Sequence, residues 1–331
     1  MIITRTPFRI SFAGGGSDLP SFYRREQGAV LSTTIDKYMY LVIHPFFNDD
    51  KIQLKYSKTE LVDKISNINH PIFREALSMY HLTGVDINSI ADIPSGTGMG
   101  SSSAFTVGLL NAIRAYIGKY SSAEKLASLA CHVEIERVGS PIGKQDQYAA
   151  AYGGLNFITF NQDESVKVEK VIMNPVVKKQ LEDNLLLIYI GGHHSANEIL
   201  KQQSSSITND SKFNLQKRMV KLAYDLREAL LANYLDDFGH ILHEGWLLKR
   251  SMVNGISNKT IDEVYDKGLK AGALGGKLPG AGGAGFILFY CPQERQEAFR
   301  REMEGCKETR FSFDHYGSQV IYVGEKLFKS K

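Results

Sequence analysis

The segment PSGTGMGSSSAF, residues 94–105, constrains the fold of this chain more than any other stretch. Its three spaced glycines lead directly into three serines, after which an apolar helical pattern begins. Glycine lets the backbone pass close to a ligand because it has no Cβ. A helix N-terminus presents unpaired N–H groups and the positive end of its dipole. The segment therefore predicts an anion site, most often one for phosphate, although a flexible loop before a well-capped helix fits the same pattern.

The length and charge of the chain limit its class. Its 331 residues are too many for one typical hydrophobic core and favour two lobes. A polar stretch at 161–169 predicts a boundary between lobes spanning 1–165 and 166–331. A formal net charge of +3 gives no reason to expect nucleic acid or an acidic membrane surface as a partner. The sequence leaves open whether the protein forms a homodimer.

The cysteines and the apolar runs indicate the compartment. Cys131, Cys291 and Cys306 are widely separated and match neither a disulfide framework nor a zinc-binding pattern, so we expect reduced thiols in a cytoplasmic protein. The first residues, MIITRTPFRISFAGGG, lack the basic, apolar and small-residue order of a signal peptide. The longest apolar runs, 185–190 and 286–291, are far too short to span a bilayer and predict buried strands.

Strands and helices are mixed without strict βαβ alternation, which favours an α+β fold over a doubly wound sheet. The β-branched and aromatic run 31–47 predicts a strand. Apolar spacings of three and four residues predict helices over 71–80 and 104–117. The serine-rich stretch 202–212 predicts a mobile loop before three further helical segments.

Two common nucleotide-binding motifs do not account for this sequence. A Walker A loop is absent, and GSPIGKQ at 139–145 only resembles one. The dinucleotide pattern G-x-G-x-x-G occurs as GAGGAG at 280–285. That pattern needs a preceding strand and a following helix, whereas a strand-like run, FILFYC, follows it here. We therefore reject a Rossmann site.

Three glycine-rich turns, at 14–18, 96–103 and 280–285, together resemble the three motifs of the GHMP kinases. This family includes galactokinase, homoserine kinase, mevalonate kinase and phosphomevalonate kinase. PSGTGMGSSSA is similar to its P-x-x-x-G-L-G-S-S-A motif, LPGAGGAGFILF to its C-terminal motif, and RTPFRISFAGGGSDLP to its first motif. The resemblance covers essentially the whole chain. It implies a two-lobe α+β fold, with an N-terminal ribosomal-protein-S5-like lobe and a C-terminal ferredoxin-like lobe.

The resemblance also implies an ATP site and a magnesium cofactor. The metal ligands would be the Ser102 hydroxyl and Glu134, which stands five residues before Gly139 and is therefore chosen over Glu136. A solvated charge on a helix face is the alternative for Glu134. The loop and helix that would hold the triphosphate comprise Pro94, Gly96, Gly98, Gly100, Ser101, Ser102 and Ser103.

By the same resemblance, Asp146 in GKQDQYAA is the catalytic aspartate, with Arg9 beside it. Lys144 would neutralise charge on the transferring phosphoryl group. A carboxyl with a pKa of about 3.9 is a weak base, but phosphoryl transfer has a loose transition state that loses the hydroxyl proton late. The alternatives are a helix cap for Asp146, a strand-edge charge for Arg9 and a surface lysine for Lys144.

The first motif would hold the acceptor. Asp18 matches the aspartate of the galactokinase signature and would accept hydrogen bonds from sugar hydroxyls. Gly15 and Gly16 replace the Glu and His of that signature, which argues against galactose. The other acceptor-binding residues that we expect are Ser17, Gln145, His194 and Gly282.

A narrower resemblance suggests the substrate. The first motif, with YSKTE, NHPIFREAL and GKQDQYAA, is similar to the D-glycero-D-manno-heptose 7-phosphate kinases, whose relatives include the fucokinase domain. His194 stands where that group has an arginine and Ile190 where it has a threonine, which leaves the acceptor-phosphate site open. Candidate cations for that phosphate are Arg24, Arg25, Lys58, Lys144, His193, His194 and Lys201.

The sequence thus predicts an ATP- and Mg²⁺-dependent kinase that phosphorylates the anomeric C1 hydroxyl of the heptose 7-phosphate. The 1,7-bisphosphate product would serve the synthesis of nucleotide-activated heptose. Two alternatives stay open at this point. One is an anomeric kinase of the same family that acts on fucose or a related sugar, and the other is a non-catalytic protein that binds sugar and ATP as a sensor.

Overall fold

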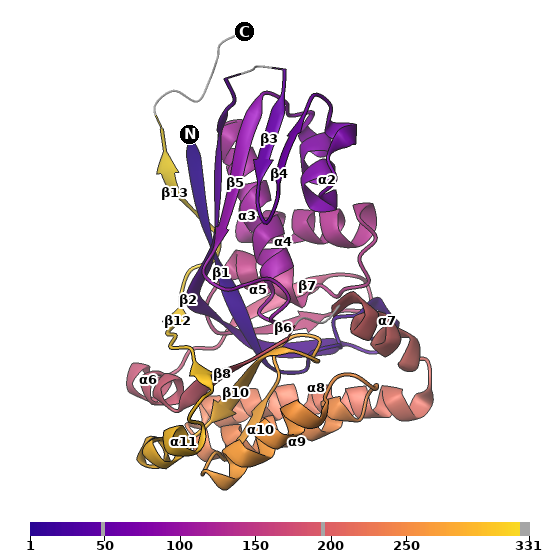
Figure 1. Cartoon of the computed structure of the whole chain (residues 1–331). Coiled ribbons are helices and arrows are strands. Elements are labelled where there is room, and N and C mark those ends of the chain that lie inside the picture. Colours follow the sequence, from indigo (N-terminus) through magenta and orange to yellow (C-terminus); the bar gives the residue numbers. More distant parts are fainter. Residues whose placement is uncertain (48–49, 193–195, 325–331) are drawn as a thin grey trace.

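The computed structural model describes residues 1–47, 50–192 and 196–324. In it a nine-stranded sheet is built around two long antiparallel strands, β1 (Ile2–Ala13) and β2 (Gly28–Pro45) (Figure 1). Their β-branched and aromatic residues suit strands that helices cover. The other strands of this sheet are β3 (Ile52–Lys55), β4 (Thr59–Val62), β5 (Val85–Ala91), β6 (Asn156–Phe160), β7 (Val166–Lys170), β12 (Phe313–Asp314) and β13 (Gln319–Val323). The main order is β13-β1-β2-β5-β3-β4, with β6 and β12 paired to β2 and β7 paired to β6.

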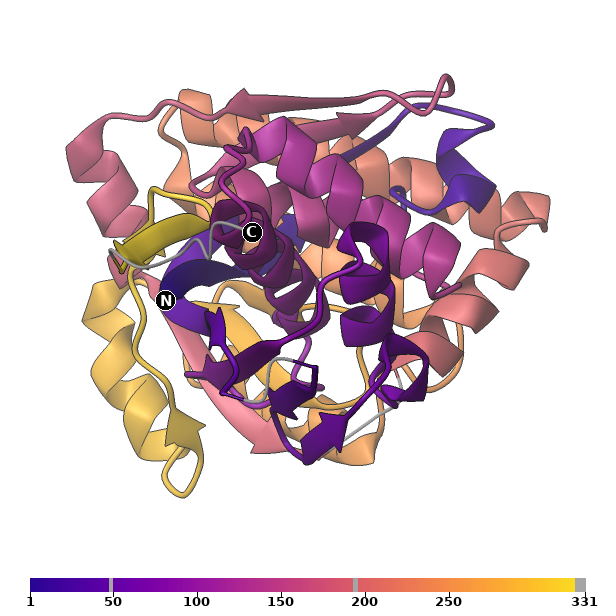
Figure 2. The ribbon, with the colours of Figure 1, turned by 90° about the horizontal axis from the view of Figure 1, so that it is seen from above.

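Helices α3 (Ser101–Tyr116), α4 (Ala123–Cys131) and α5 (Gln145–Tyr152) pack on one another, and α3 packs directly on β1 and β2. Figure 2 shows these helices, in magenta, together on one side of the purple strands. Gly108 lets α3 approach the sheet closely, because a Cβ there would lie 2.8 Å from the Thr6 hydroxyl. The Thr4 hydroxyl donates to the Gly108 carbonyl at 3.0 Å. This packing fixes the N-terminus of α3, which belongs to the site described below.

The second half of the chain builds a four-stranded sheet in the order β11-β8-β10-β9. Helix α9 (Leu235–Arg250) packs on this sheet and on α8 (Asp210–Leu231), both at the lower end of Figure 1. Trp246 of α9 is fully buried, as expected for a packing anchor. The four strands are β8 (Leu185–Gly191), β9 (Gly275–Lys277), β10 (Gly285–Tyr290) and β11 (Lys307–Glu308).

The last strands return to the first sheet. β13 lies beside β1, and β12 pairs with β2, so that the yellow end of the chain meets the indigo strands in Figure 1. β7 also belongs to this sheet. The lobe boundary between 1–165 and 166–331 stays a prediction, but three strands beyond residue 165 are members of the N-terminal sheet.

Most of the elements predicted from the sequence are confirmed, and one is wrong. The predicted helix 71–80 is α2 (Pro71–Tyr80), and the strand 31–47 lies largely within β2. The stretch 202–212 was expected to be a loop, but it contains the end of helix α7 (Ala196–Ser206) and the start of α8. Burial of Gln203 and Ile207 against the rest of the protein outweighs the weak helix propensity of the serines.

The remaining elements are short or peripheral. None of the helices in the described part of the chain is both long and apolar enough to cross a membrane. β3 and β5 pair in parallel, and the other described strand pairs are antiparallel, in keeping with an α+β fold. The remaining helical elements are α1 (Pro20–Tyr23), η1 (Ile65–Asn67), the π-helix η2 (His132–Arg137), α6 (Pro175–Asp183), α10 (Lys259–Lys270), η3 (Gln293–Arg295) and α11 (Gln296–Glu302).

Candidate functional site

The second and third glycine-rich turns touch through their backbones. A Cβ on Gly98 would lie 2.5 Å from the carbonyl oxygen of Pro279, and one on Gly285 would lie 2.4 Å from that of Thr97. Gly98 and Gly285 have φ angles of 80° and 100°, which residues with a side chain rarely adopt. Glycine is therefore required here for close packing as well as for the turn.

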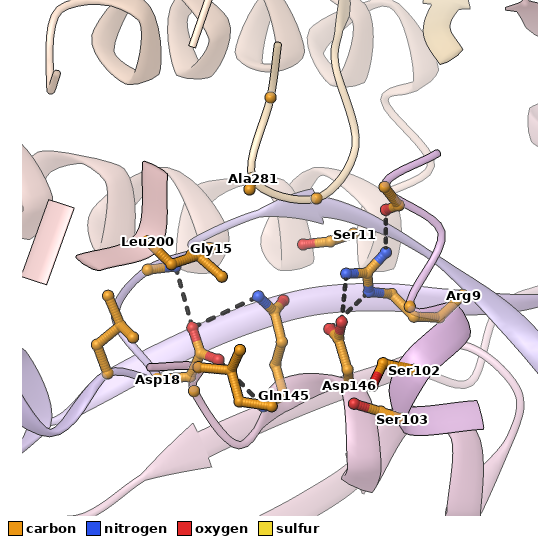
Figure 3. Close-up of a pocket in the computed structure, with 18 of the residues that line it drawn as sticks. Arg9, Ser11, Gly15, Asp18, Ser102, Ser103, Gln145, Asp146, Leu200 and Ala281 are labelled. Atoms are coloured by element: carbon orange, nitrogen blue, oxygen red, sulfur yellow. Dashed lines mark hydrogen bonds and ion pairs between the residues drawn. The ribbon is translucent and has the colours of Figure 1, made fainter. Parts of the chain in front are cut away.

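The first turn completes the same cavity. The backbone N–H of Arg9 donates to the Met99 carbonyl at 3.1 Å, which ties β1 to the second turn. Residues of all three turns line a cavity of about 460 Å³. In Figure 3 the third turn, marked by Ala281, lies across this cavity from Gln145 and Asp146. Three segments that are distant in the sequence thus form one site.

The N-terminus of α3 opens into this cavity. The helix begins at Ser101 after Gly100, whose φ of 74° is left-handed, and no side chain caps its first turn. Ser101, Ser102 and Ser103 all line the cavity. Free N–H groups, serine hydroxyls and the positive end of a four-turn helix make a site suited to phosphate.

Arg9 and Asp146 form the central ion pair of the site. The Arg9 Nε and Nη2 atoms donate to the two Asp146 carboxylate oxygens at 2.8 and 2.7 Å, and Nη1 donates to the Gly98 carbonyl at 2.6 Å. Arg9 is almost fully buried, whereas the Asp146 side chain is 23% exposed and lines the cavity. The guanidinium therefore fixes the carboxylate at the start of α5 while leaving it open to the cavity.

Glu134 is a fully buried carboxylate held by neutral donors. The hydroxyls of Ser102 and Ser103 donate to its two oxygens at 2.6 and 2.8 Å, and Gln147 Nε2 donates at 2.7 Å. Burial raises the pKa of Glu134, and these hydrogen bonds oppose that rise. The π-helix η2 presents Glu134 to α3, as such widened turns often do at functional sites.

A carboxylate and a hydroxyl are oxygen ligands of the kind that Mg²⁺ prefers. No group of three or more His, Cys, Asp or Glu side chains within the described ranges is placed to hold a metal by itself. Glu134 and Ser102 therefore fit a Mg²⁺ ion that takes its other ligands from phosphate oxygens and water.

Asp18 is a buried carboxylate in the wall of the cavity. It accepts hydrogen bonds from the backbone N–H groups of Gly16 and Gln145 at 3.0 and 3.1 Å, and from Gln145 Nε2 at 3.4 Å. Burial, and then the charge of Asp146, raises the pKa of Asp18 to about 6. A Cβ on Gly143 would lie 1.9 Å from an Asp18 oxygen, so glycine at that position makes room for this carboxylate.

Two more polar atoms are buried in the same region without a hydrogen-bond partner, Ser11 Oγ and Gln145 Oε1. Both residues line the cavity, and Figure 3 shows their side chains between Asp18 and Arg9. Buried polar atoms are normally paired, so these two are available to hydroxyl groups of a ligand. Ser11 was not predicted from the sequence, although it follows Arg9 by two residues on the same face of a strand.

Two buried lysines of the cavity were also missed, Lys249 and Lys277. Lys249 follows an apolar run on α9, and Lys277 stands three residues before the third turn. A lysine inside an apolar stretch is a signal for burial. It does not tell which cavity the side chain enters.

Several predicted residues, Glu134 among them, are not lining residues of the cavity in the described part of the chain. Lys144 Nζ donates to Glu164 at 2.5 Å and lies 4.6 Å from the Tyr23 ring centroid, so its charge is already paired. The Ser17 hydroxyl donates to the carbonyl of Ala29 on β2 at 3.1 Å, and the Pro94 carbonyl accepts from the Thr97 hydroxyl at 2.9 Å. The predicted residues that do line the cavity are Arg9, Gly15, Gly16, Asp18, Gly96, Gly98, Gly100, Ser101, Ser102, Ser103, Gln145, Asp146 and Gly282.

The cations suggested for an acceptor phosphate do not gather in the described part of this cavity. Arg24 pairs with Glu164, and Arg25 pairs with Asp210. Lys58 and Lys201 are not among the lining residues. His193 and His194 lie outside the described residues, so the prediction for His194 stays a prediction.

A glycine-rich loop that opens into a helix N-terminus, beside a carboxylate fixed by arginine, defines a phosphate-handling enzyme. The family model of the GHMP kinases N terminal domain matches residues 63–154, and that of the GHMP kinases C terminal matches 226–306. Together these matches span over half of the chain. The chain belongs to the GHMP kinases and is a phosphotransferase with an alcohol group as acceptor.

Individual relatives resemble the chain over its whole length. It is 26% identical over 332 residues to D-glycero-alpha-D-manno-heptose 7-phosphate kinase of Campylobacter jejuni, a match that covers 94% of this chain and 96% of that protein. The crystal structure of a D-glycero-D-manno-heptose 1-phosphate kinase from Bacteroides thetaiotaomicron has a TM-score of 0.80 at 26% identity, covering 98% of this chain and 100% of that one. The bifunctional fucokinase/GDP-fucose pyrophosphorylase of Arabidopsis thaliana is 26% identical over 324 residues, which cover 90% of this chain and 30% of that protein.

Proposed function

We propose that this protein is an ATP-dependent sugar kinase that transfers the γ-phosphoryl group to the C1 hydroxyl of D-glycero-D-manno-heptose 7-phosphate. The product, a 1,7-bisphosphate, would serve the synthesis of nucleotide-activated heptose. The observation that carries the proposal is the Arg9–Asp146 pair at the point where the three glycine-rich turns meet. The full-length similarity to a heptose 7-phosphate kinase supports the choice of sugar.

The nucleotide is proposed to bind with its phosphates at the loop 96–100 and the first turn of α3. Gly98 and Gly100 have left-handed φ and line the cavity, and glycine-rich loops of this kind bind anions through their backbone N–H groups. Mg²⁺ would bind Ser102 and Glu134 and would neutralise charge on the phosphates. Ser102 and Ser103 hydrogen-bond to Glu134 in the structure, so Ser102 would exchange this bond for the metal.

Asp146 is proposed to orient the acceptor hydroxyl and to receive its proton. Its two oxygens accept hydrogen bonds from Arg9, which holds the carboxylate in one orientation. A carboxylate suffices to receive this proton because the proton leaves late in a loose transition state. Most of the rate enhancement would come from positioning and charge neutralisation. Lys144 is not needed for this step, since its ammonium group is paired with Glu164.

Asp18, Gln145 and Ser11 are proposed to bind the sugar hydroxyls. A buried carboxylate, an unpaired amide oxygen and an unpaired hydroxyl offer short polar partners on a rigid wall. Gly15, Gly16 and Gly282 also line the cavity, and without side chains they would leave room for the ring. A sugar that lacks one of these hydroxyls would leave a buried polar atom unpaired, which is how such walls select their ligands.

The proposal is tested by measuring ADP release with a panel of hexoses, heptoses and their phosphates, followed by phosphorus and carbon NMR of the product. We expect heptose 7-phosphate to be the best acceptor and the new phosphate to be on C1. The names of the two heptose-phosphate relatives place their acceptor phosphate on different carbons, 7 and 1, so heptose 1-phosphate belongs in the panel. Preference for that acceptor would overturn the proposed position.

The alternative substrate is fucose or a related sugar without a phosphate, which the similarity to fucokinases favours. Turnover of fucose well above that of heptose 7-phosphate would decide for it. A non-catalytic sensor would bind ATP and release no ADP with any member of the panel. Arg9 and Asp146 meet in the cavity wall, and Glu134 lies behind that wall, bonded to Ser102 and Ser103. This arrangement argues against a sensor, because binding alone does not require a carboxylate fixed by arginine.

A further inference from the structure

Two lysines are buried in the wall of the cavity without an acidic partner. Lys249 on α9 and Lys277 on β9 are each only 6% exposed. Lys249 Nζ donates to the carbonyls of Leu278, at 3.2 Å, and of Gly280, and Lys277 Nζ donates to the Phe12 carbonyl at 3.0 Å. Within the described ranges neither lysine forms an ion pair, and neither is used in the mechanism above.

Their carbonyl partners place them beside the reacting groups. Gly280 opens the third turn, and a Cβ on it would lie 2.5 Å from the Cα of Gly98 in the second turn. Gly98 in turn accepts the Arg9 hydrogen bond. Phe12 is three residues beyond Arg9 on β1. The two ammonium groups therefore belong to the wall that the C-terminal half contributes, close to the Arg9–Asp146 pair.

The electrostatics agree with this placement. Burial, together with the charge of Arg9, lowers the pKa of Lys249 to about 7, and the nearby Asp146 opposes that shift. Burial and the charges of Lys249 and Arg9 hold the pKa of Lys277 well below its usual range. The cavity thus has three basic side chains and one ion-paired carboxylate at this end, and an anion bound beside the two lysines would favour their charged form. Burying an ammonium group is unfavourable unless an anion compensates it.

We propose that Lys249 and Lys277 act with Arg9 to bind the phosphoryl group while it is transferred. In this step a lone pair of the acceptor oxygen forms the new bond to the γ-phosphorus. The bond from that phosphorus to the bridging oxygen breaks, its electron pair leaves on ADP, and the acceptor proton goes to Asp146. The two ammonium groups would donate to the non-bridging oxygens, on which the transition-state charge lies. The inference rests on the proposed function, since it assigns residues to that reaction.

The alternative is that the lysines bind the acceptor's own phosphate. Lys249 is close enough to Arg9 and Asp146 for both charges to affect its pKa, which favours the reacting end of the acceptor. A phosphate on C7 of a sugar that reacts at C1 would lie at the opposite end of that sugar. We therefore assign the pair to the transferred group and treat the acceptor phosphate as an outcome of the test.

The test measures ADP affinity with Mg²⁺, with and without tetrafluoroaluminate, a mimic of the transferred group, for the full chain and the variants Lys249→Met and Lys277→Met. We expect tetrafluoroaluminate to tighten ADP binding to the unaltered protein. In each variant the factor by which it tightens ADP binding should be at least tenfold smaller, while the affinity for ADP alone should change less than about twofold. An unchanged gain in both variants, or no gain in the unaltered protein, would overturn the proposal. Lys170→Met is the control, since Lys170 also donates to a backbone carbonyl, that of Gly153, but lies outside the cavity.

A second measurement separates the two phosphates. With the best acceptor we expect each variant to lower kcat about 100-fold or more, with little change in the KM for that acceptor. A different combination of results would assign the lysines to the acceptor phosphate instead. The variants would then raise the KM for heptose 7-phosphate, leave the KM for the sugar without its phosphate unaffected, and leave the tightening of ADP binding by tetrafluoroaluminate unchanged. The binding measurement contains no sugar, so its result stands even if the proposed acceptor is wrong. Thermal unfolding of each variant serves as the control that its fold is intact.

Discussion

Asp18 and Asp146 line the same cavity on either side of Gln145, and the charge of Asp146 contributes to raising the pKa of Asp18 to about 6 (Figure 3). Asp146 has a guanidinium partner, whereas Asp18 has only amide donors. The two carboxyl groups are therefore suited to different tasks. We assign proton transfer to Asp146 and sugar binding to Asp18.

Asp18 should give the ligand-free protein a specific pH dependence of stability. Its pKa of about 6 in the folded state lies above the ordinary value of 3.8, so the folded protein holds this proton more tightly than the unfolded chain does. The stabilising contribution is complete below about pH 4 and is lost as the pH rises through 6, an effect of about 3 kcal/mol. Asp18→Asn should remove this dependence in urea unfolding measured from pH 4 to 8. Asp237→Asn, at an exposed position of α9, should leave the profile unchanged, and a profile unaltered by Asp18→Asn would contradict the assignment.

Asp146→Asn should lower kcat about 10³-fold or more, because the amide cannot accept the proton of the acceptor hydroxyl. ATP affinity should change little, since the proposed phosphate site lies on the loop 96–100 and α3. Steady-state ADP release and equilibrium ATP binding measure the two effects. Asp163→Asn, in the exposed turn between β6 and β7, is the control. Substantial residual turnover by the Asp146 variant would remove this residue from its role.

Glu134→Gln should raise the Mg²⁺ concentration needed for half-maximal activity about tenfold, because a neutral amide is a weaker ligand than a carboxylate. A Mg²⁺ titration of ADP release at saturating ATP measures this. Glu136→Gln is a matched control two residues away, where the carboxylate is exposed and pairs with His132. Equal effects of the two substitutions, or none, would refute Glu134 as a ligand.

Gly98→Ala should destabilise the protein by about 3 kcal/mol, because the added Cβ would meet the Pro279 carbonyl at 2.5 Å in a backbone with a φ of 80°. Gly139→Ala separates the cost of a side chain in a left-handed backbone from the cost of a Cβ contact. Gly139 has a φ of 74° and open space around its Cβ position. We expect Gly139→Ala to lower the free energy of unfolding by only about 1 kcal/mol. Chemical denaturation of both variants is the measurement. Similar losses would show that contact between the two turns is not what requires glycine at 98.

Asp18→Asn should also weaken sugar binding far more than ATP binding, because we assign this carboxylate, which accepts only from neutral donors, to the sugar hydroxyls. Calorimetry with the best acceptor and with ATP compares the two. Comparable losses for both ligands would indicate a general effect on the site. Asp237→Asn again provides the control.

Local patterns in the sequence predicted much of the site. The helix 71–80 and the loop that opens into α3 follow from patterns contained in a few neighbouring residues. The nearness of Arg9 to Asp146 was implied by the resemblance to the family. The serine-rich stretch 202–212 was predicted wrongly because its helices depend on packing against the rest of the protein. Lys144 was chosen for its nearness in sequence to Asp146, but its ammonium group pairs with Glu164.

By itself the sequence determined the α+β class, the three glycine-rich turns and the family to which they belong, since backbone freedom at glycine and helix capping are local properties. Only the tertiary structure decided that Lys249, Lys277 and Ser11 enter the cavity, and that the pKa of Asp18 is raised. Those features depend on which distant segments exclude water from a side chain and which charges come within a few ångströms of it. Neither is encoded in the spacing of residues along the chain.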